Sequence, residues 1–237
     1  MVDEAAAYIK SQAPDLSWVY LEYTDDMGHR FGDSEQFHTA IGYMDRQMGR
    51  LWESIQFREK NFNEEWLIVI TTDHGRSEKD GKGHGGQSDR ERATWMVHNA
   101  RNINGALAKN NYLPGIVDIM PSVAAHMNIS LPKEQSFELD GIPLTGKTSI
   151  INPVIVKSEQ KINVSWKALD QEGKVKIWLS TTNNFKSGGK DYYYLMKEIP
   201  VTDSQAILDI SQLPSRFYKV VLEANYNHLN RWIIETN

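Results

Sequence analysis

Cysteine is absent from this 237-residue chain. Its absence excludes disulfide bonds and thiolate zinc sites, and it leaves Asp, Glu and His as the strong metal ligands. It does not indicate a compartment, because a chain without cysteine suits both the cytosol and an oxidising space.

Long hydrophobic runs and an excess of basic residues are missing too. No apolar run approaches the length of a membrane span. The formal net charge is −5, which argues against nucleic-acid binding through bulk charge, because proteins that bind in this way carry a basic face or stripe. The first residues lead directly into a helix-like segment, so the sequence shows no signal peptide. Neither the number of subunits nor a partner protein is indicated.

Residues 67–72 form a continuous apolar run that ends abruptly in Asp73-His74-Gly75. Such a run predicts a strand that is buried on both faces, as in a parallel sheet. Open α/β sheets bind ligands just beyond the carboxyl ends of their strands. Asp73 and His74 therefore lie where chemistry is expected, and Gly75 would permit the bend that lets both side chains converge.

A second strand is predicted over 15–23, and it also stops at an acid and a histidine, Asp25 and His29. The four-residue spacing would let both side chains reach one ion on a tight turn. A long helix capped by Ser34 follows, and its apolar residues repeat at spacings of three and four, namely Phe37, Ile41, Met44, Met48, Leu51 and Ile55. The order strand, helix, strand predicts a βαβ unit with a parallel sheet.

The pattern changes after about residue 150, where short segments alternate apolar and polar residues between turn residues. This alternating pattern predicts a small all-β sandwich. We expect two domains, residues 1–148 and residues 149–237. The strands are expected at 162–166, 175–179, 192–196, 206–210, 218–224 and 231–234. The many aromatic residues of this part are expected to fill the sandwich core rather than to form a sugar-binding surface.

Five residues form a candidate metal group: Asp25, His29, Asp73, His74 and His84. His84 lies in a glycine-rich loop. Carboxylate and imidazole ligands together suit zinc, another transition metal or manganese. The alternative is that the aspartates only cap turns or helices, which is the interpretation favoured for Asp26. The remaining histidines have no such neighbours and are interpreted as ordinary: His38, His98, His126 and His228. Two cations beside this group, Arg76 and Lys82, are interpreted as surface charges, although a phosphate site would also use them.

Several segments in the first 147 residues resemble the alkaline phosphatase superfamily, and within it the type I phosphodiesterase and nucleotide pyrophosphatase branch. Residues 23–32 resemble its Asp-x-x-Gly-His-x-x-Gly segment, and residues 72–75 its Asp-His-Gly segment. Residues 83–86 resemble the segment of its last histidine ligand, and residues 113–123 with 139–144 its closing segment.

The resemblance implies an α/β fold: the C-terminal portion of an alkaline-phosphatase-like α/β/α sandwich, followed by the small all-β domain. It implies two divalent metal ions, zinc or else manganese. Asp25, His29 and His84 would hold one, and Asp73 with His74 the other together with upstream ligands. The implied activity is hydrolysis of a small phosphate ester or nucleotide, and the implied location is extracytoplasmic.

The family's nucleophile and a further aspartate ligand have no convincing counterpart here. No catalytic residue is therefore assigned, substrate-binding residues are unknown, and this chain by itself is expected to be inactive. A sulfatase or another hydrolase of the superfamily is the nearest rival. A non-catalytic binding protein with a vestigial metal core is an alternative of another class. The β-rich domain resembles fibronectin type III or immunoglobulin-like modules.

Overall fold

A computed structural model of the chain describes residues 1–235. It divides into two compact units, Met1–Asn99 and Ala100–Asn237. No helix in the described part of the chain is both long enough and apolar enough to cross a bilayer.

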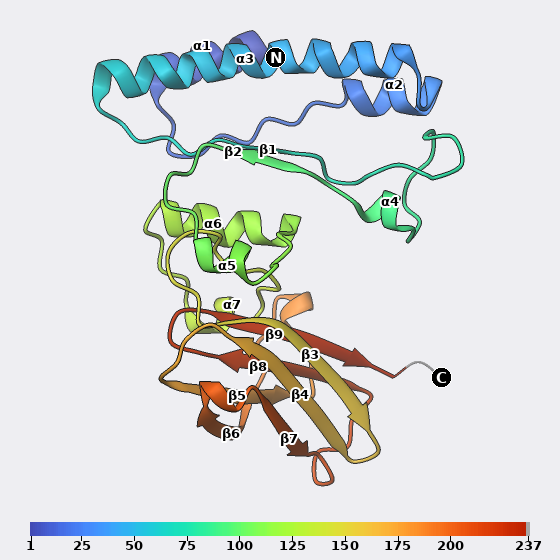
Figure 1. The fold of residues 1–237 in the computed structure, drawn as a ribbon, viewed down its shortest axis with the longest axis vertical. Helices are drawn as coiled ribbons and strands as arrows, with labels where there is room; N and C mark the ends of the chain where they lie inside the picture. Colours follow the sequence, from blue (N-terminus) through green and yellow to red (C-terminus); the bar gives the residue numbers. More distant parts are fainter. Residues whose placement is uncertain (236–237) are drawn as a thin grey trace. The chain divides into compact units, whose positions relative to one another are not determined.

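Three helices dominate the first unit (Figure 1): α1 (Val2–Gln12), α2 (Tyr23–Phe31) and α3 (Glu35–Phe62). The predicted cap of α3 is confirmed, because the Ser34 side chain accepts a hydrogen bond from the Phe37 amide at 3.2 Å. The apolar stripe of α3 is buried only towards its C-terminal end, where Leu51 and Ile55 pack with Ile9 of α1. This cluster is the hydrophobic core of the unit.

The sheet of the first unit has two short strands, β1 (Val69–Thr71) and β2 (Met96–His98). They pair antiparallel, with Ile70 opposite Val97. The predicted strand over 67–72 is therefore present in shortened form, but the predicted parallel βαβ pairing is wrong for the described residues. The one-turn helix α4 (Asp89–Arg92) leads into β2 and begins with a capping box between Ser88 and Glu91.

The predicted strand over 15–23 is also wrong, because residues 15–22 have no strand assignment and helix α2 begins at Tyr23. Strand propensity depends strongly on what a segment packs against. The charge pattern of α2 favours a helix: Asp25 and Asp26 lie in the first turn, while His29 and Arg30 lie in the last. Each pair complements the partial charge of its helix end.

The second unit begins with short helices: α5 (Gly105–Lys109), the 3₁₀ turn η1 (Ile116–Asp118), α6 (Ile119–His126) and α7 (Lys133–Ser136). Helix α6 follows η1 without a break, so the two form one continuous helical segment over 116–126.

Two antiparallel sheets follow, one with the strand order β3-β4-β7 and the other with the order β6-β5-β8-β9. The strands are β3 (Ile150–Ser158), β4 (Lys161–Ala168), β5 (Lys174–Ser180), β6 (Tyr194–Pro200), β7 (Gln205–Asp209), β8 (Phe217–Glu223) and β9 (His228–Ile234). The turns η2 (Phe185–Ser187) and η3 (Val201–Asp203) lie between them. Six of these strands match predicted segments. The sequence pattern missed β3, whose regular pairing breaks between Ile151 and Val154 around Pro153.

Buried residues alternate along the central strands, as in Val175, Ile177 and Leu179 of β5, each fully buried. Alternation of this kind is expected where two sheets pack face to face. The Tyr218 hydroxyl donates to the Leu213 carbonyl at 2.9 Å, five residues upstream. Immunoglobulin-like sandwiches carry a similar tyrosine corner.

The predicted fold class is confirmed: an α/β portion is followed by a sheet-rich C-terminal portion. The domain division at 148/149 and the likeness to fibronectin type III or immunoglobulin-like modules stay predictions. The compact units of the structure meet after Asn99, and residues 100–148 belong to the same unit as the sheets that follow them.

Candidate metal centre

Helix α2 positions the first two predicted ligands. Asp25 and His29 are four residues apart, so the helix places them one above the other on the same face. The Nε2 atom of His29 lies 3.2 Å from Oδ2 of Asp25. A helical turn, rather than the expected tight turn after a strand, brings these two side chains together.

The segment after β1 positions His74. The His74 Nδ1 atom lies 2.8 Å from the carbonyl oxygen of Gly75. If Nδ1 carries the proton and donates it there, the lone pair of Nε2 is free for a metal, which is the usual arrangement of a ligating histidine. Gly75 is needed for close approach, because a Cβ at this position would lie 1.9 Å from the Arg90 carbonyl oxygen.

The loop after His74 brings in His84. The Ser77 amide donates to the Gly83 carbonyl at 2.7 Å and closes this loop on itself. The His84 ring then stacks on His74, with centroids 3.8 Å apart and an interplanar angle of 18°. Its Nε2 atom lies 3.0 Å from Nε2 of His29.

Four of the five predicted ligands therefore meet around one carboxylate. Oδ1 of Asp25 lies 3.9 Å from Nε2 of His74 and 3.8 Å from Nε2 of His84. One ligand atom from each of these three residues lies within 4.8 Å of the other two. Asp73 stays more exposed, with Oδ1 3.6 Å from Nε2 of His74. The predicted division of the five residues between two metals stays a prediction.

The donor set fits a divalent transition metal. Two imidazole nitrogens that bind one zinc at about 2.0–2.1 Å lie roughly 3.3 Å apart at a tetrahedral angle. The 3.0 Å between His29 and His84 is close to this spacing. An anionic oxygen and imidazole nitrogens are a common zinc ligand set.

Arg76 is a charged residue beside the cluster, and its contact with Asp25 was not predicted from the sequence. Its side chain is about nine-tenths buried, and Nη1 donates to Oδ1 of Asp25 at 2.7 Å. Partial burial would raise the pKa of Asp25, but this hydrogen bond and the neighbouring cationic side chains outweigh burial and leave that pKa below its ordinary value. No local pattern pointed to this pairing, because the two residues are 51 positions apart.

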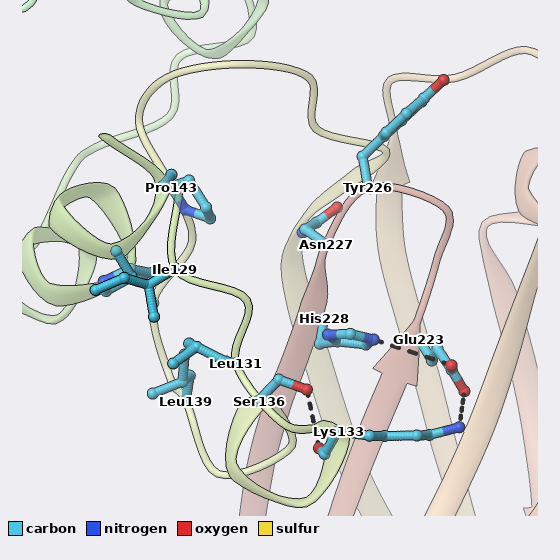
Figure 2. Close-up of a pocket in the computed structure, with 14 residues that line it drawn as sticks. Ile129, Leu131, Lys133, Ser136, Leu139, Pro143, Glu223, Tyr226, Asn227 and His228 are labelled. Carbon is cyan, nitrogen blue, oxygen red and sulfur yellow. Dashed lines mark hydrogen bonds and ion pairs between the residues drawn. The ribbon is translucent and has the colours of Figure 1, made fainter. Parts of the chain in front are cut away.

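A separate cavity of about 370 Å³ lies in the second unit (Figure 2). None of the five predicted ligands lines it. Its walls are mostly apolar, and its charged groups already have partners: Nζ of Lys133 donates to Glu223 at 3.0 Å, and His228 lies 4.0 Å from the same carboxylate.

A family model described as type I phosphodiesterase / nucleotide pyrophosphatase matches residues 1–122. The chain belongs to this family. The match runs from α1 into α6 and includes all five predicted ligands. It confirms the superfamily and the branch that the sequence motifs indicate.

This phosphodiesterase-family chain is 28% identical over 143 residues to a 2,3-bisphosphoglycerate-independent phosphoglycerate mutase of Mycoplasma mycoides subsp. mycoides SC. The similarity covers 58% of this chain and 24% of the mutase. The chain thus spans about a quarter of the length of that curated relative.

Two solved structures show weak likenesses to the chain. The spore cortex lytic enzyme SleM of Clostridium perfringens is 13% identical with a TM-score of 0.29, over 39% of this chain and 29% of SleM. The fn3 domain of human collagen alpha-1(XX) chain is 17% identical with a TM-score of 0.27, over 39% of this chain and 88% of that domain. At such scores neither likeness supports a conclusion.

Proposed function

We propose that this chain supplies the metal-binding part of the active site of a phosphoester hydrolase of the phosphodiesterase or nucleotide pyrophosphatase type. Asp25, His29 and His84 would hold one divalent cation, and Asp73 with His74 would contribute to a second. Zinc is the preferred ion, with manganese as the alternative.

The observation that carries this proposal is the convergence of Asp25, His29, His74 and His84 from three separate segments. Ordinary capping aspartates and surface histidines would not place their ligand atoms around one carboxylate. Family membership supports phosphate-ester chemistry for this site.

The Asp25 carboxylate and the clustered imidazoles would form a preorganised binding site for the cation. Asp25 would offset the charge of a bound cation, and the imidazoles would offer nitrogen lone pairs as ligands. The Gly75 carbonyl would hold the His74 ring in one orientation through its contact with Nδ1. Bound divalent cations stabilise the negative charge that develops on phosphoryl oxygens and on the attacking and leaving oxygens.

We assign no nucleophile within this chain. We therefore propose that the chain alone binds metal without turnover, and that hydrolysis requires a longer polypeptide that also carries the nucleophile.

The test measures zinc and manganese binding by calorimetry on the wild-type chain and on His84→Ala. The matched control is His38→Ala, because His38 is an exposed histidine of α3 outside the cluster. We expect His84→Ala to bind metal at least tenfold more weakly, because the metal loses one of its ligands. His38→Ala should bind metal with wild-type affinity.

The activity assay compares bis-p-nitrophenyl phosphate with p-nitrophenyl sulfate, using both this chain and the full-length gene product with and without zinc. Zinc-dependent phosphodiester hydrolysis by the full-length product supports the proposal, whereas preference for the sulfate supports a sulfatase. If the full-length product binds metal but hydrolyses neither ester, a non-catalytic binding protein is the better description.

A further inference from the structure

Arg76 connects the three segments that carry the clustered ligands. It lies two residues after His74, and its guanidinium donates to Oδ1 of Asp25 at 2.7 Å and to the Asp25 carbonyl at 3.5 Å. On its other side it donates to the carbonyls of Gly81 and Lys82, the latter at 3.2 Å. Those carbonyls lie in the loop that ends at His84.

We propose that Arg76 is a positioning residue: it fixes the Asp25 carboxylate towards His74 and His84, and it fastens the 77–84 loop to helix α2. This inference rests on the proposed metal site, but its structural part can be measured without metal. Arg76 itself is not proposed as a ligand or as a group that contacts substrate.

The shape of the guanidinium suits this role. Its acceptors lie on different segments, and a planar group with five N–H donors in a fixed fork can serve several of them at once. A lysine ammonium is a compact point charge on a flexible stem, so it would hold the carboxylate without fixing the loop in the same geometry.

Gly28 provides the space that Arg76 occupies. A Cβ at Gly28 would lie 2.3 Å from the guanidinium carbon of Arg76, which is far inside contact distance. Gly28 lies on α2 between Asp25 and His29. The glycine in this segment therefore lets the guanidinium approach the helix beside both ligands, and a methyl group there would push it away.

The opposite role would also have a physical basis. A guanidinium on Oδ1 of Asp25 could compete with a metal ion for that oxygen, and removing it would then strengthen metal binding. The two roles predict changes of opposite sign in metal affinity. The structure favours positioning because the guanidinium makes three further hydrogen bonds, to the carbonyls of Asp25, Gly81 and Lys82, that a competitor for one oxygen would not need.

The first experiment titrates the chain with Co²⁺, followed by its visible absorption, and then with Zn²⁺ in competition. It compares the wild type with Arg76→Gln, Arg76→Lys and Arg92→Gln. Arg92 pairs with Asp89 on the surface, so Arg92→Gln removes the same charge without touching a ligand. We expect the dissociation constant to rise about 10- to 100-fold for Arg76→Gln, as for other partners of metal ligands. We expect the dissociation constant of Arg76→Lys to lie between those of the wild type and Arg76→Gln. The dissociation constant of Arg92→Gln should equal that of the wild type.

A second pair of variants displaces the guanidinium without deleting its charge. Gly28→Ala should weaken metal binding about as much as Arg76→Gln, because it pushes the flexible end of Arg76 off Asp25. Gly49→Ala is the control, since a Cβ at that helical position meets nothing within 4 Å. Wild-type metal affinity in Gly28→Ala would contradict the proposal.

The third measurement is amide hydrogen exchange of the 77–84 loop in metal-free protein. Loss of the Arg76 hydrogen bonds should speed exchange about tenfold in Arg76→Gln, and Arg92→Gln should leave it unchanged. If the wild type binds no cobalt while this exchange difference is present, the proposed function fails and the positioning role of Arg76 stands. Unchanged exchange, or tighter metal binding in Arg76→Gln, would overturn the inference.

Discussion

Asp118 shows how a buried carboxylate can serve structure alone. Its side chain is fully buried and accepts hydrogen bonds from the Tyr112 hydroxyl at 3.0 Å, the Gly115 amide at 2.8 Å and the Ile142 amide at 2.7 Å. It thereby joins the residues around η1 to the 139–144 segment. Both segments were assigned to the family's closing motif by resemblance, and this carboxylate is the physical link between them.

Replacing Asp118 should be costly. Asp118→Ala would leave three donors without their acceptor, and we expect it to lower the free energy of unfolding by about 3 kcal/mol or more. Asp118→Asn should lower the free energy of unfolding by less, because the asparagine amide keeps one acceptor oxygen. Urea denaturation measures both variants. The exposed neighbour Asp140 provides the control, with Asp140→Asn expected within about 0.5 kcal/mol of the wild type. A loss below 1 kcal/mol in Asp118→Ala would mean that these hydrogen bonds contribute little.

Helix α3 is the element that the sequence predicted best. Its periodic apolar residues and its serine cap indicate a helix whichever tertiary partners it has. The degree of burial was not predictable in the same way. Leu51 and Ile55 are buried, whereas Ile41 of the same stripe is 46% exposed. Periodicity identifies a face, but only the packed neighbours decide how much of that face is covered.

The cap of α3 can be tested directly. Ser34→Ala removes the acceptor for the Phe37 amide and should destabilise the first unit by about 1 kcal/mol. Ser34→Asp should retain wild-type stability, because aspartate is an equally good cap and its charge favours a helix N-terminus. Thermal unfolding followed by circular dichroism compares the three proteins. Equal stability of the alanine and serine forms would show that the cap is replaced by water.

The five predicted ligands belong to one compact unit of the molecule. All lie in Met1–Asn99, and Ala100–Asn237 contains none of them. A ligand that binds only the folded state stabilises the unit that binds it, by an amount set by the ratio of its free concentration to its dissociation constant.

Metal should therefore raise the stability of the first unit selectively. At a free zinc concentration of 100 times the dissociation constant, the free energy of unfolding of the first unit should rise by about 2.7 kcal/mol. Hydrogen exchange with zinc and with EDTA measures the two units separately. Protection should rise in α2 and in the 77–84 loop and stay constant in β5 and β8. Equal gains in both units would contradict a metal site confined to the first.

The sequence by itself determined the candidate ligands, the α3 helix and six of the seven C-terminal strands. These features depend on residue type and local periodicity, which are visible in the chain without its partners. The C-terminal strands were recognisable because each alternates apolar and polar residues between turns. β3 was not predicted, because Pro153 interrupts its alternating pattern.

Tertiary structure decided the rest. It made residues 23–31 a helix, paired β1 antiparallel with β2, and seated Arg76 between Asp25 and the loop of His84. Each outcome depends on contacts between segments far apart in the chain, and local propensity is too weak to specify such contacts. The Asp25–Arg76 pair is the clearest case: both residues were visible in the sequence, but only folding brings them within 2.7 Å.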